Sequence, residues 1–283
     1  MTRRTLASEI QTEGIALHAG TPVRMTLAPA PPNTGVVFCR GDLGGGTIPA
    51  RYDHVGETRL GTVIQNHAAS VGVIEHLMAA LCGAEIDDLL VTVDGPELPI
   101  LDGDGLSYLR LIQQAGISES AAPGAAIQVL KPVEAAQGEA RAGLFPAEDR
   151  TFDFEIEFSA PAIGRQSFTW AFSRHGFERE IAPARTFGFV QELKALNRAG
   201  LGRGASLENT LAIDGDNVIN ANLMRFPDEF VRHKILDAIG DLALAGAPLL
   251  GRFEGRRSGH ALNNQLLRAL FADPANYDRI TVD

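Results

Sequence analysis

Hydrophobic and polar residues alternate in several short stretches, and this pattern predicts β-strands in both halves of the chain. In the first half, residues 23–30 and 36–40 flank a Pro-Pro-Asn-Thr-Gly turn, and an apolar run follows at 89–93. In the second half, residues 140–145 and 152–158 have strand-like composition, and the last of these segments alternates strictly. The sequence therefore predicts a β-sheet in each half.

Helical periodicity, in which apolar residues recur every three or four positions, occupies four other segments. Residues 71–83 and 106–114 lie in the first half, and residues 227–245 and 260–270 lie in the second. Each half then has the same order of elements: strands, a helix, a short apolar strand and a second helix. This order predicts an α+β fold of two similar, duplicated domains, although sequence identity between the halves is weak.

The segment 117–126 is small, polar and contains Pro and Gly, a composition that is typical of a linker. We therefore expect one domain at 1–118 and the other at 127–283. Each half also contains material outside the repeated pattern, at about 41–62 and at about 186–216. Inserts on a repeated scaffold commonly build binding surface, so both segments are expected to contribute to a site.

Composition and charge narrow the classes of function. The chain has 283 residues, of which 45% are hydrophobic and 21% charged, as in soluble globular proteins. Its net charge of −10 disfavours general nucleic-acid binding and an electrostatic membrane anchor. Two cysteines, Cys39 and Cys82, are too few for a disulfide scaffold or a cysteine-rich zinc module. No apolar run approaches the roughly 18 residues of a membrane span and no signal peptide is visible, so we expect a cytoplasmic protein.

One face of the predicted helix at 227–245 carries four ionisable residues. They share about one quadrant of the helix surface at about 100° per residue, with apolar residues on the far side: His233, Lys234, Asp237 and Asp241. A His and an Asp at positions i and i+4 are neighbours and can chelate one divalent ion. His233 and Asp237 are therefore candidate ligands that need a third partner.

The predicted helix at 71–83 carries an ionisable pair, Glu75 and His76, opposite its apolar arc. The small residues Gly72 and Ala79 lie beside this pair, and we expect them to leave open space above it. Adjacent side chains on a helix point about 100° apart, so one can ligate an ion while the other acts on a water molecule. His76 is the best-placed third ligand, and two histidines with one carboxylate make a catalytic zinc set.

His260 is a further candidate because it follows Ser258-Gly259 at a predicted helix start, where side chains tend to face a site. Other interpretations remain open for each feature. A His-x-x-x-Asp pair on a helix is more often a surface ion pair, and a His at a helix start can be incidental to the cap. The sequence has no HExxH, GxxxxGK[ST] or GxGxxG motif, which argues against a zincin, a nucleoside-triphosphate site and a dinucleotide site.

Six segments taken together resemble bacterial UDP-3-O-acyl-N-acetylglucosamine deacetylases. They are GIALHAG (14–20), VIEHLMAAL (73–81), DGPELPILDG (94–103), ARTFGF (184–189), EFVRHKILDAIGDL (229–242) and SGHALNN (258–264). The resemblance covers nearly the whole chain in order. It implies removal of the acetyl group from UDP-3-O-(3-hydroxyacyl)-N-acetylglucosamine, the committed step of lipid A biosynthesis. It also implies two similar α+β domains, each with an insert, that sandwich the active site.

The resemblance implies one catalytic metal ion and a set of residues with roles around it. The expected ion is Zn²⁺, and Fe²⁺ is an alternative that suits the same ligands. Three residues match the metal ligands of the family: His76, His233 and Asp237. Two match its acid–base pair: Glu75 as general base and His260 as general acid. Three match polar residues beside the metal: Lys234, Asp241 and Thr186, the last of which stabilises the oxyanion. The expected partner is the UDP-sugar substrate, without nucleic acid or a membrane span, and we expect a monomer.

The resemblance also implies substrate-binding residues. Phe158 matches an aromatic residue that stacks on the uracil, Arg257 matches a basic residue near the nucleotide, and His18 matches a residue of the same cleft. The second insert matches an acyl-chain tunnel, with these expected walls: Phe187, Val190, Leu193, Gly202 and Leu207. Ordinary helix packing explains such apolar residues equally well. Two positions depart from the family. Arg59 replaces an apolar residue that some members have, and Asp104 stands where many members have a serine.

Two other functions stay open on the sequence. The same metal set would serve an amidohydrolase of a different N-acyl sugar, and analysis of the product formed from the nucleotide sugar distinguishes the two enzymes. A non-catalytic module that binds a nucleotide sugar or an acyl chain needs neither a general base nor a general acid. The presence of both Glu75 and His260 counts against that module.

Overall fold

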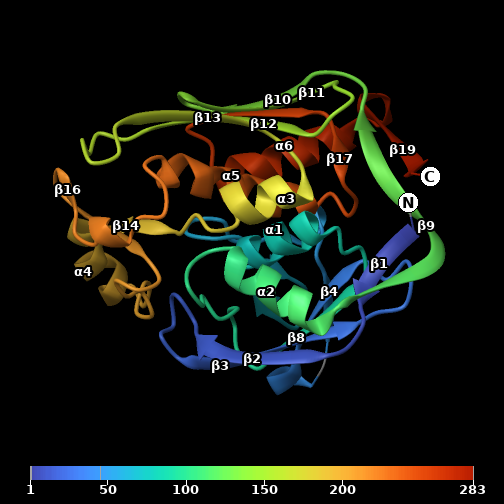
Figure 1. Cartoon of the computed structure of the whole chain (residues 1–283), viewed down its shortest axis with the longest axis horizontal. Helices are drawn as coiled ribbons and strands as arrows, with labels where there is room; N and C mark the ends of the chain where they lie inside the picture. The colour runs from blue at the N-terminus through green and yellow to red at the C-terminus, as the bar shows by residue number, and fades with distance from the viewer. Residues whose placement is uncertain (1, 45, 283) are drawn as a thin grey trace.

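Two five-stranded sheets form the outer layers of the molecule and enclose a layer of helices (Figure 1). The computed structural model describes residues 2–44 and 46–282. The first sheet has the order β2 (Ile10–Ile15), β3 (Pro22–Pro29), β8 (Leu89–Val93), β4 (Val36–Arg40) and β5 (Thr47–Pro49). The second has the order β10 (Val133–Gln137), β11 (Ala140–Phe145), β18 (Arg252–Arg256), β12 (Thr151–Glu157) and β13 (Arg165–Ala171). The strands predicted from alternation are therefore present.

The two sheets share one topology. The central strand β8 is antiparallel to β3 and parallel to β4. In the second sheet, β18 is likewise antiparallel to β11 and parallel to β12. The outer pairs of both sheets are antiparallel. The α+β class is therefore confirmed, and the equal order and direction of the strands support a duplication.

Four helices fill the space between the sheets. α1 (Glu75–Ala84) and α2 (Leu106–Ala115) precede and follow β8, and α5 (Glu229–Ala243) and α6 (His260–Ala272) precede and follow the equivalent strand β18. α1 packs against α5 in the middle of the molecule (Figure 1). Every residue of α1 except Cys82 is buried, so this helix lies at the centre of the core. Within the described residues, no helix has the length and apolar character needed to cross a membrane.

The helix expected at 71–83 begins later than predicted, whereas the other three agree within two residues. Val73 adopts a left-handed conformation with φ 57°, which a β-branched residue rarely adopts, and α1 starts two residues further on. The open space expected above Glu75 and His76 is present, because both residues line a cavity, although Gly72 and Ala79 themselves are buried outside it. A Cβ at Gly72 would lie 3.3 Å from the side chain of Val63. Gly72 therefore allows close packing behind the pair and does not line the cavity.

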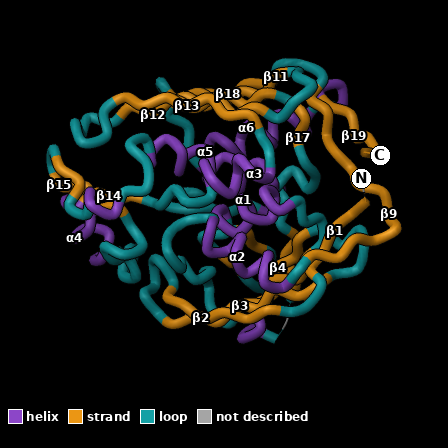
Figure 2. The backbone as a smooth tube through the Cα atoms, viewed as in Figure 1, coloured by secondary structure: helices purple, strands orange, loops and turns teal. Residues whose placement is uncertain are grey.

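Residues 117–126 do not form the expected linker. They belong to the long strand β9 (Ile117–Val129), which pairs with β1 (Thr2–Leu6), β17 (Leu249–Leu250) and β19 (Tyr277–Val282). Figure 2 shows β9 along one side of the molecule, between the two main sheets. Ala, Ser and Gly have little intrinsic preference for strands, but pairing of these residues with β1 and β19 compensates for this. The boundaries at 1–118 and 127–283 stay a prediction.

The two expected inserts differ in how much they add to the sheets. The first, at 41–62, includes β5, which is an edge strand of the first sheet. Part of this segment therefore belongs to the repeated sheet and is not an insert. The second forms β14 (Phe187–Phe189), α4 (Val190–Arg198) and β15 (Leu211–Asp214), which lie at the left end of the molecule in Figure 1. The remaining short elements are β6 (Ile64–Gln65), β7 (Ser70–Val71), β16 (Asn217–Val218), α3 (Arg174–Gly176), η1 (Gly41–Leu43), η2 (Tyr52–His54), η3 (Phe177–Ile181), η4 (Ala221–Leu223) and η5 (Pro274–Asn276).

The contact between α1 and α5 predicts the effect of one added methyl group. A Cβ at Gly240 would lie 2.0 Å from the main-chain oxygen of Glu75, and main chain cannot move aside as a flexible side chain can. We expect Gly240→Ala to push the helices apart and to lower the free energy of unfolding by about 1–3 kcal/mol or more. Denaturant unfolding followed by circular dichroism measures this change.

Gly46→Ala is the control for this prediction. A Cβ at Gly46 would lie 4.0 Å from Asn66 Nδ2, which is ordinary contact, so unfolding should change by less than about 0.5 kcal/mol. A Gly240→Ala protein as stable as the wild type would contradict the close approach of the two helices.

Candidate metal and active site

Two helices bring three metal-ligand side chains together. His76 is the second residue of α1, and His233 and Asp237 lie one turn apart on α5. The Nε2 atoms of His76 and His233 lie 3.6 Å and 3.4 Å from the same oxygen of Asp237, Oδ1. The ligand atoms of all three residues lie within 4.8 Å of one another, and all three residues are buried. The structure thus groups the three candidate ligands that the sequence indicated.

Hydrogen bonding and burial prepare this cluster for a cation. His233 Nδ1 lies 3.1 Å from the main-chain oxygen of Ala184 and donates to it, so the lone pair of Nε2 is free. Burial lowers the pKa of His233 to about 3, which keeps the ring neutral. Burial alone would raise the pKa of Asp237, but His233, Lys234 and His76 hold that pKa well below its usual range. Imidazole and ionised carboxylate are donors that suit Zn²⁺ or Fe²⁺.

Lys234 and His76 complete the charge balance around Asp237. Lys234 Nζ donates to Oδ2 of Asp237 at 2.7 Å, whereas Oδ1 faces both imidazoles. Burial alone would lower the pKa of His76, but its hydrogen bond with Asp237 and the charge of Glu75 raise that pKa. A cation that binds here therefore competes with a proton for this ring. His76 Nδ1 is buried without a hydrogen-bond partner among the described residues, so only packing and the contact of Nε2 with Asp237 orient this ring.

Glu75 and His260 lie next to each other beside the cluster. His260 Nε2 is 3.9 Å from Glu75 Oε1, and His260 Nδ1 is 2.9 Å from Asp241 Oδ2. Burial raises the pKa of Glu75, so this carboxylate is more basic than one in water. Burial alone would lower the pKa of His260, but Asp241 and Glu75 raise it to about 9. A basic carboxylate beside an imidazolium suits a general base and a general acid.

Two residues that the sequence analysis did not identify hold the carboxylates in place. Thr62 donates its hydroxyl to Asp241 Oδ1 at 2.6 Å and its main-chain N–H to Glu75 Oε2 at 2.9 Å. Asn263 Nδ2 donates to Asp241 Oδ2 at 2.9 Å. Asn263 belongs to the segment SGHALNN, and that match is the one signal that pointed to it. Thr62 is distant in sequence from Asp241, so no spacing rule could have paired them.

The cluster opens into a cavity of about 640 Å³, a volume typical of small-molecule sites. Ten of the predicted site residues line this cavity: Glu75, His76, Phe158, Thr186, Phe187, His233, Lys234, Asp237, Arg257 and His260. Asp241 does not line it, because this buried residue lies behind the ring of His260. The main-chain N–H of Thr186 donates to the oxygen of Gly103 at 2.8 Å, which ties this wall to the first half of the chain.

Five predicted substrate-binding residues lie outside this cavity: His18, Val190, Leu193, Gly202 and Leu207. His18 bridges the two inserts, because its Nε2 lies 3.1 Å from the oxygen of Leu60 and its Nδ1 lies 3.4 Å from the nitrogen of Gly202. Leu193 and Leu207 are 37% and 45% exposed, and α4 has no buried residue. Their role as tunnel walls stays a prediction.

The two residues that depart from the family lie in different places. Arg59 lines the cavity and makes its wall more polar. Asp104 lies outside the cavity, where its Oδ1 accepts a hydrogen bond from the N–H of Ser107 at 2.9 Å and its Oδ2 pairs with Arg225. Asp104 acts on a candidate ligand through its charge, which helps to raise the pKa of His76.

The chain is similar to known proteins over nearly its whole length. A family described as UDP-3-O-acyl N-acetylglycosamine deacetylase matches residues 3–272. The chain belongs to this deacetylase family. Proteins named UDP-3-O-acyl-N-acetylglucosamine deacetylase from Myxococcus xanthus and Phenylobacterium zucineum are 45% and 47% identical to it. These matches cover 98% and 97% of this chain and 88% and 94% of the relatives. A protein of the same name from Acidithiobacillus ferrooxidans is 48% identical over 95% of this chain and 89% of its own length.

A buried ion pair between Arg185 and Glu229 holds the segment just before Thr186 in place. Glu229 Oε1 accepts from the main-chain nitrogen and from Nε of Arg185, at 3.1 Å and 3.0 Å. Arg185 stands between Thr186 and Ala184, whose oxygen holds His233. Glu229 is 0% exposed and was not among the predicted site residues, because a glutamate in a first helical turn usually marks only a helix start. It therefore positions two site residues through the main chain.

We expect Glu229→Ala to lower the free energy of unfolding by about 3–5 kcal/mol, because it leaves the charge of Arg185 buried without the carboxylate that neutralises it. Urea unfolding measures this loss. The matched control is Glu13→Ala, which breaks the exposed ion pair of Glu13 with Arg24 and should cost about 1 kcal/mol or less. Equal losses in the two variants would show that the buried pair is not essential.

Proposed function

We propose that this protein hydrolyses the N-acetyl group of UDP-3-O-(3-hydroxyacyl)-N-acetylglucosamine to the free amine and acetate, the committed step of lipid A biosynthesis. The observation that carries this proposal is the placement of Glu75 beside His260, 3.9 Å apart, next to a buried His-His-Asp cluster in a chain of the deacetylase family. Amide hydrolysis needs a base for the attacking water and an acid for the leaving amine, and this pair can supply both.

The proposed cofactor is one Zn²⁺ per chain, held by His76, His233 and Asp237, with Fe²⁺ as the other ion that suits these donors. When bound, such an ion lowers the pKa of coordinated water and polarises a carbonyl group. The neutral ring of His233 and the ionised carboxylate of Asp237 support this assignment.

The residues around the cluster divide the acid–base work. Glu75 accepts the proton of the attacking water, and burial makes it a better base. His260 donates a proton to the nitrogen of the leaving amine, and Asp241 keeps His260 protonated for this step. Thr186 and Lys234 line the same cavity and offer a hydroxyl and an ammonium group to the oxygen that becomes negatively charged.

The cavity wall and the second insert are proposed to select the substrate. Phe158 packs edge-to-face with Phe187, with ring centroids 5.6 Å apart, and offers an aromatic surface to the uracil. Arg257 offers positive charge to the diphosphate, although it also pairs with Glu139 and Glu157. The apolar residues of the second insert are the proposed surface for the acyl chain: Val190, Leu193, Gly202 and Leu207.

We further propose that the protein acts as a monomer in the cytoplasm. Cys39 and Cys82 are both free thiols, which fits a reducing compartment. The three candidate ligands, the base and the acid all come from one chain, so the site needs no second copy.

The direct test is mass spectrometry of acetate release from UDP-3-O-acyl-N-acetylglucosamine, with acyl chains from none to about fourteen carbons. Each buried methylene contributes up to about 0.8 kcal/mol, so two carbons fewer should lower kcat/KM by up to about tenfold. A lack of acetate release from every substrate would contradict the proposed function. If the unacylated sugar nucleotide turns over as efficiently as the acylated one, the proposed acyl-chain site is wrong. That result would favour an amidohydrolase of another N-acyl sugar.

Substitution of the ligands should separate metal binding from chemistry. We expect His76→Ala, His233→Ala and Asp237→Ala each to lose bound metal and activity, because each removes one of only three protein donors. Glu75→Gln should keep the metal and lower kcat by about 10²–10⁴-fold. Elemental analysis of the purified variants measures the metal. Full zinc content in all three ligand variants would disprove the metal site, and normal turnover of Glu75→Gln would disprove the base.

The pH dependence of kcat/KM should be bell-shaped, because Glu75 acts ionised and His260 acts protonated. Activity rises as pH passes the raised pKa of Glu75 and falls as pH passes the pKa of His260 at about 9. Asp241→Asn removes a negative charge that raises the pKa of His260, so the alkaline limb should move to lower pH by about 1–3 units. Asp153→Asn, outside the cavity, is the control. An alkaline limb that stays in place in Asp241→Asn would mean that another group supplies the proton.

A further inference from the structure

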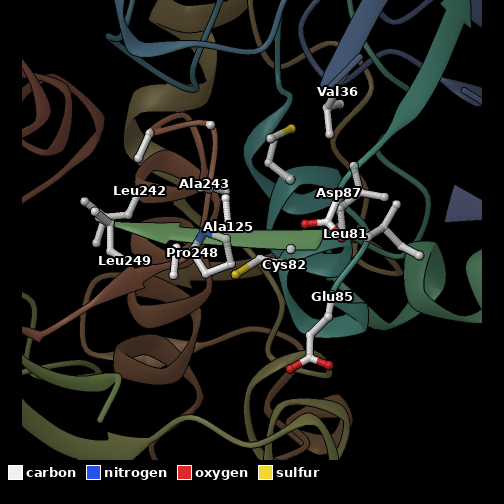
Figure 3. A pocket seen from close by; sticks show the side chains of 18 of the residues that line it. Val36, Leu81, Cys82, Glu85, Asp87, Ala125, Leu242, Ala243, Pro248 and Leu249 are labelled. Atoms are coloured by element: carbon white, nitrogen blue, oxygen red, sulfur yellow. The ribbon is translucent and has the colours of Figure 1, made fainter. Parts of the chain in front are cut away.

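A second cavity, of about 710 Å³, lies at the end of the α1–α5 pair that is remote from the candidate ligands. Figure 3 shows Leu81 and Cys82 of α1 on one side of it, Leu242 and Leu249 on the other, and Ala125 of β9 between them. None of the predicted site residues lines this cavity. It is therefore separate from the site described above, and its volume lies within the range of about 300–1,000 Å³ that is common for ligand sites.

The inner wall of this second cavity is apolar. Leu81, Leu242 and Phe253 line it, although each is at most 5% exposed. Ala243 and Pro248 stand near its centre in Figure 3, and such short side chains leave the volume unfilled. Atoms that line an unfilled apolar volume lack packing partners, which costs stability. A ligand with an apolar body would supply those partners.

The rim of the second cavity is basic, in contrast to the net charge of −10 of the whole chain. Among the described residues, six arginines and three carboxylates line it. Several of these arginines already have carboxylate partners: Arg3 pairs with Asp88 at 2.7 Å, and Arg174 pairs with Glu85 at 3.2 Å. Their charges are therefore largely neutralised within the protein.

Arg150 differs from these paired arginines. Its guanidinium lies 3.8 Å from the ring centroid of Phe172, and its Nη2 donates to Cys82 Sγ at 2.8 Å. No carboxylate in the described part of the chain forms an ion pair with it. The ring and the thiol thus orient this guanidinium without neutralising it. A guanidinium held beside an apolar cavity is suited to bind a carboxylate or a phosphate.

We propose that this second cavity binds an amphipathic anion, an acyl chain with a carboxylate or phosphate head group. The apolar chain occupies the space between α1, α5 and β9, and the head group pairs with Arg150. The proposal goes beyond the hydrolysis proposed above and does not depend on it. Because the ligand contacts β9, which joins the layers, as well as both central helices, its binding should also raise Tm.

The two cysteines allow one experiment to report on this cavity alone. Both thiols are free and partly exposed, but only Cys82 lines the cavity. We expect sodium decanoate, below its micellar concentration, to slow alkylation of Cys82 by iodoacetamide about tenfold or more without slowing alkylation of Cys39. Mass spectrometry of peptides measures both rates. Decyl phosphate tests the second head group, and decanol and acetate, which lack the charge or the chain, should protect Cys82 at least about tenfold less.

Substitution of Arg150 tests the head-group contact. Arg150→Gln should weaken the protection of Cys82 by decanoate about tenfold, judged by the ratio of rates with and without decanoate in each protein. Arg179→Gln is the matched control, because Arg179 is exposed and lies outside the cavity. Unchanged alkylation of Cys82 in the presence of decanoate and of decyl phosphate would overturn the proposal. Undiminished protection in Arg150→Gln, or equal protection by decanol, would overturn the anion contact.

Discussion

The candidate site depends on how closely α1 approaches α5. Gly240 has no Cβ, and an added one would lie only 2.0 Å from the main-chain oxygen of Glu75. At this separation His76 of α1 reaches the carboxylate of Asp237 on α5, although the two residues belong to different halves of the chain. A bulkier residue at position 240 would move His76 away from Asp237. The geometry of the three candidate ligands is therefore a consequence of helix packing, and a glycine makes that packing possible.

The same close approach buries several charged groups together, and the structure compensates each of them. Asp237 has Lys234 on one oxygen and two imidazoles on the other. Asp241 accepts hydrogen bonds from Thr62 and Asn263 and faces His260. Buried charges without such partners would be strongly destabilising. Burial raises the pKa of Glu75, whereas the charges of Asp241 and Glu75 raise the pKa of His260 against the effect of burial. One packing arrangement therefore places a more basic carboxylate beside a more basic imidazole.

Local patterns predicted much of this molecule, and contacts between distant segments account for the rest. The spacing of His233 and Asp237 on one helix was sufficient to group them, because i and i+4 positions always lie close. Strand β12 was predictable because its alternation has the period of a half-buried strand. Strand β9 was not, since its partners β1 and β19 come from the two ends of the chain and outweigh its weak intrinsic preference. The hydrogen bond from Thr62 to Asp241 joins residues 179 positions apart and has no local signal.

Asp104 shows how the fold accommodates a departure from the family in the loop before α2. Its Oδ1 accepts the N–H of Ser107 at the start of α2, and a serine at this position could serve the same purpose. Its Oδ2 has a second partner, Arg225, which also donates to the oxygen of Pro183 at 2.7 Å. A serine would leave the guanidinium of Arg225 with one carboxylate among the described residues, that of the exposed Asp102, 3.9 Å away. The carboxylate therefore retains the cap and adds an ion pair between the loop before α2 and the segment that leads into α5, so it ties the two halves together close to the residues that hold His233.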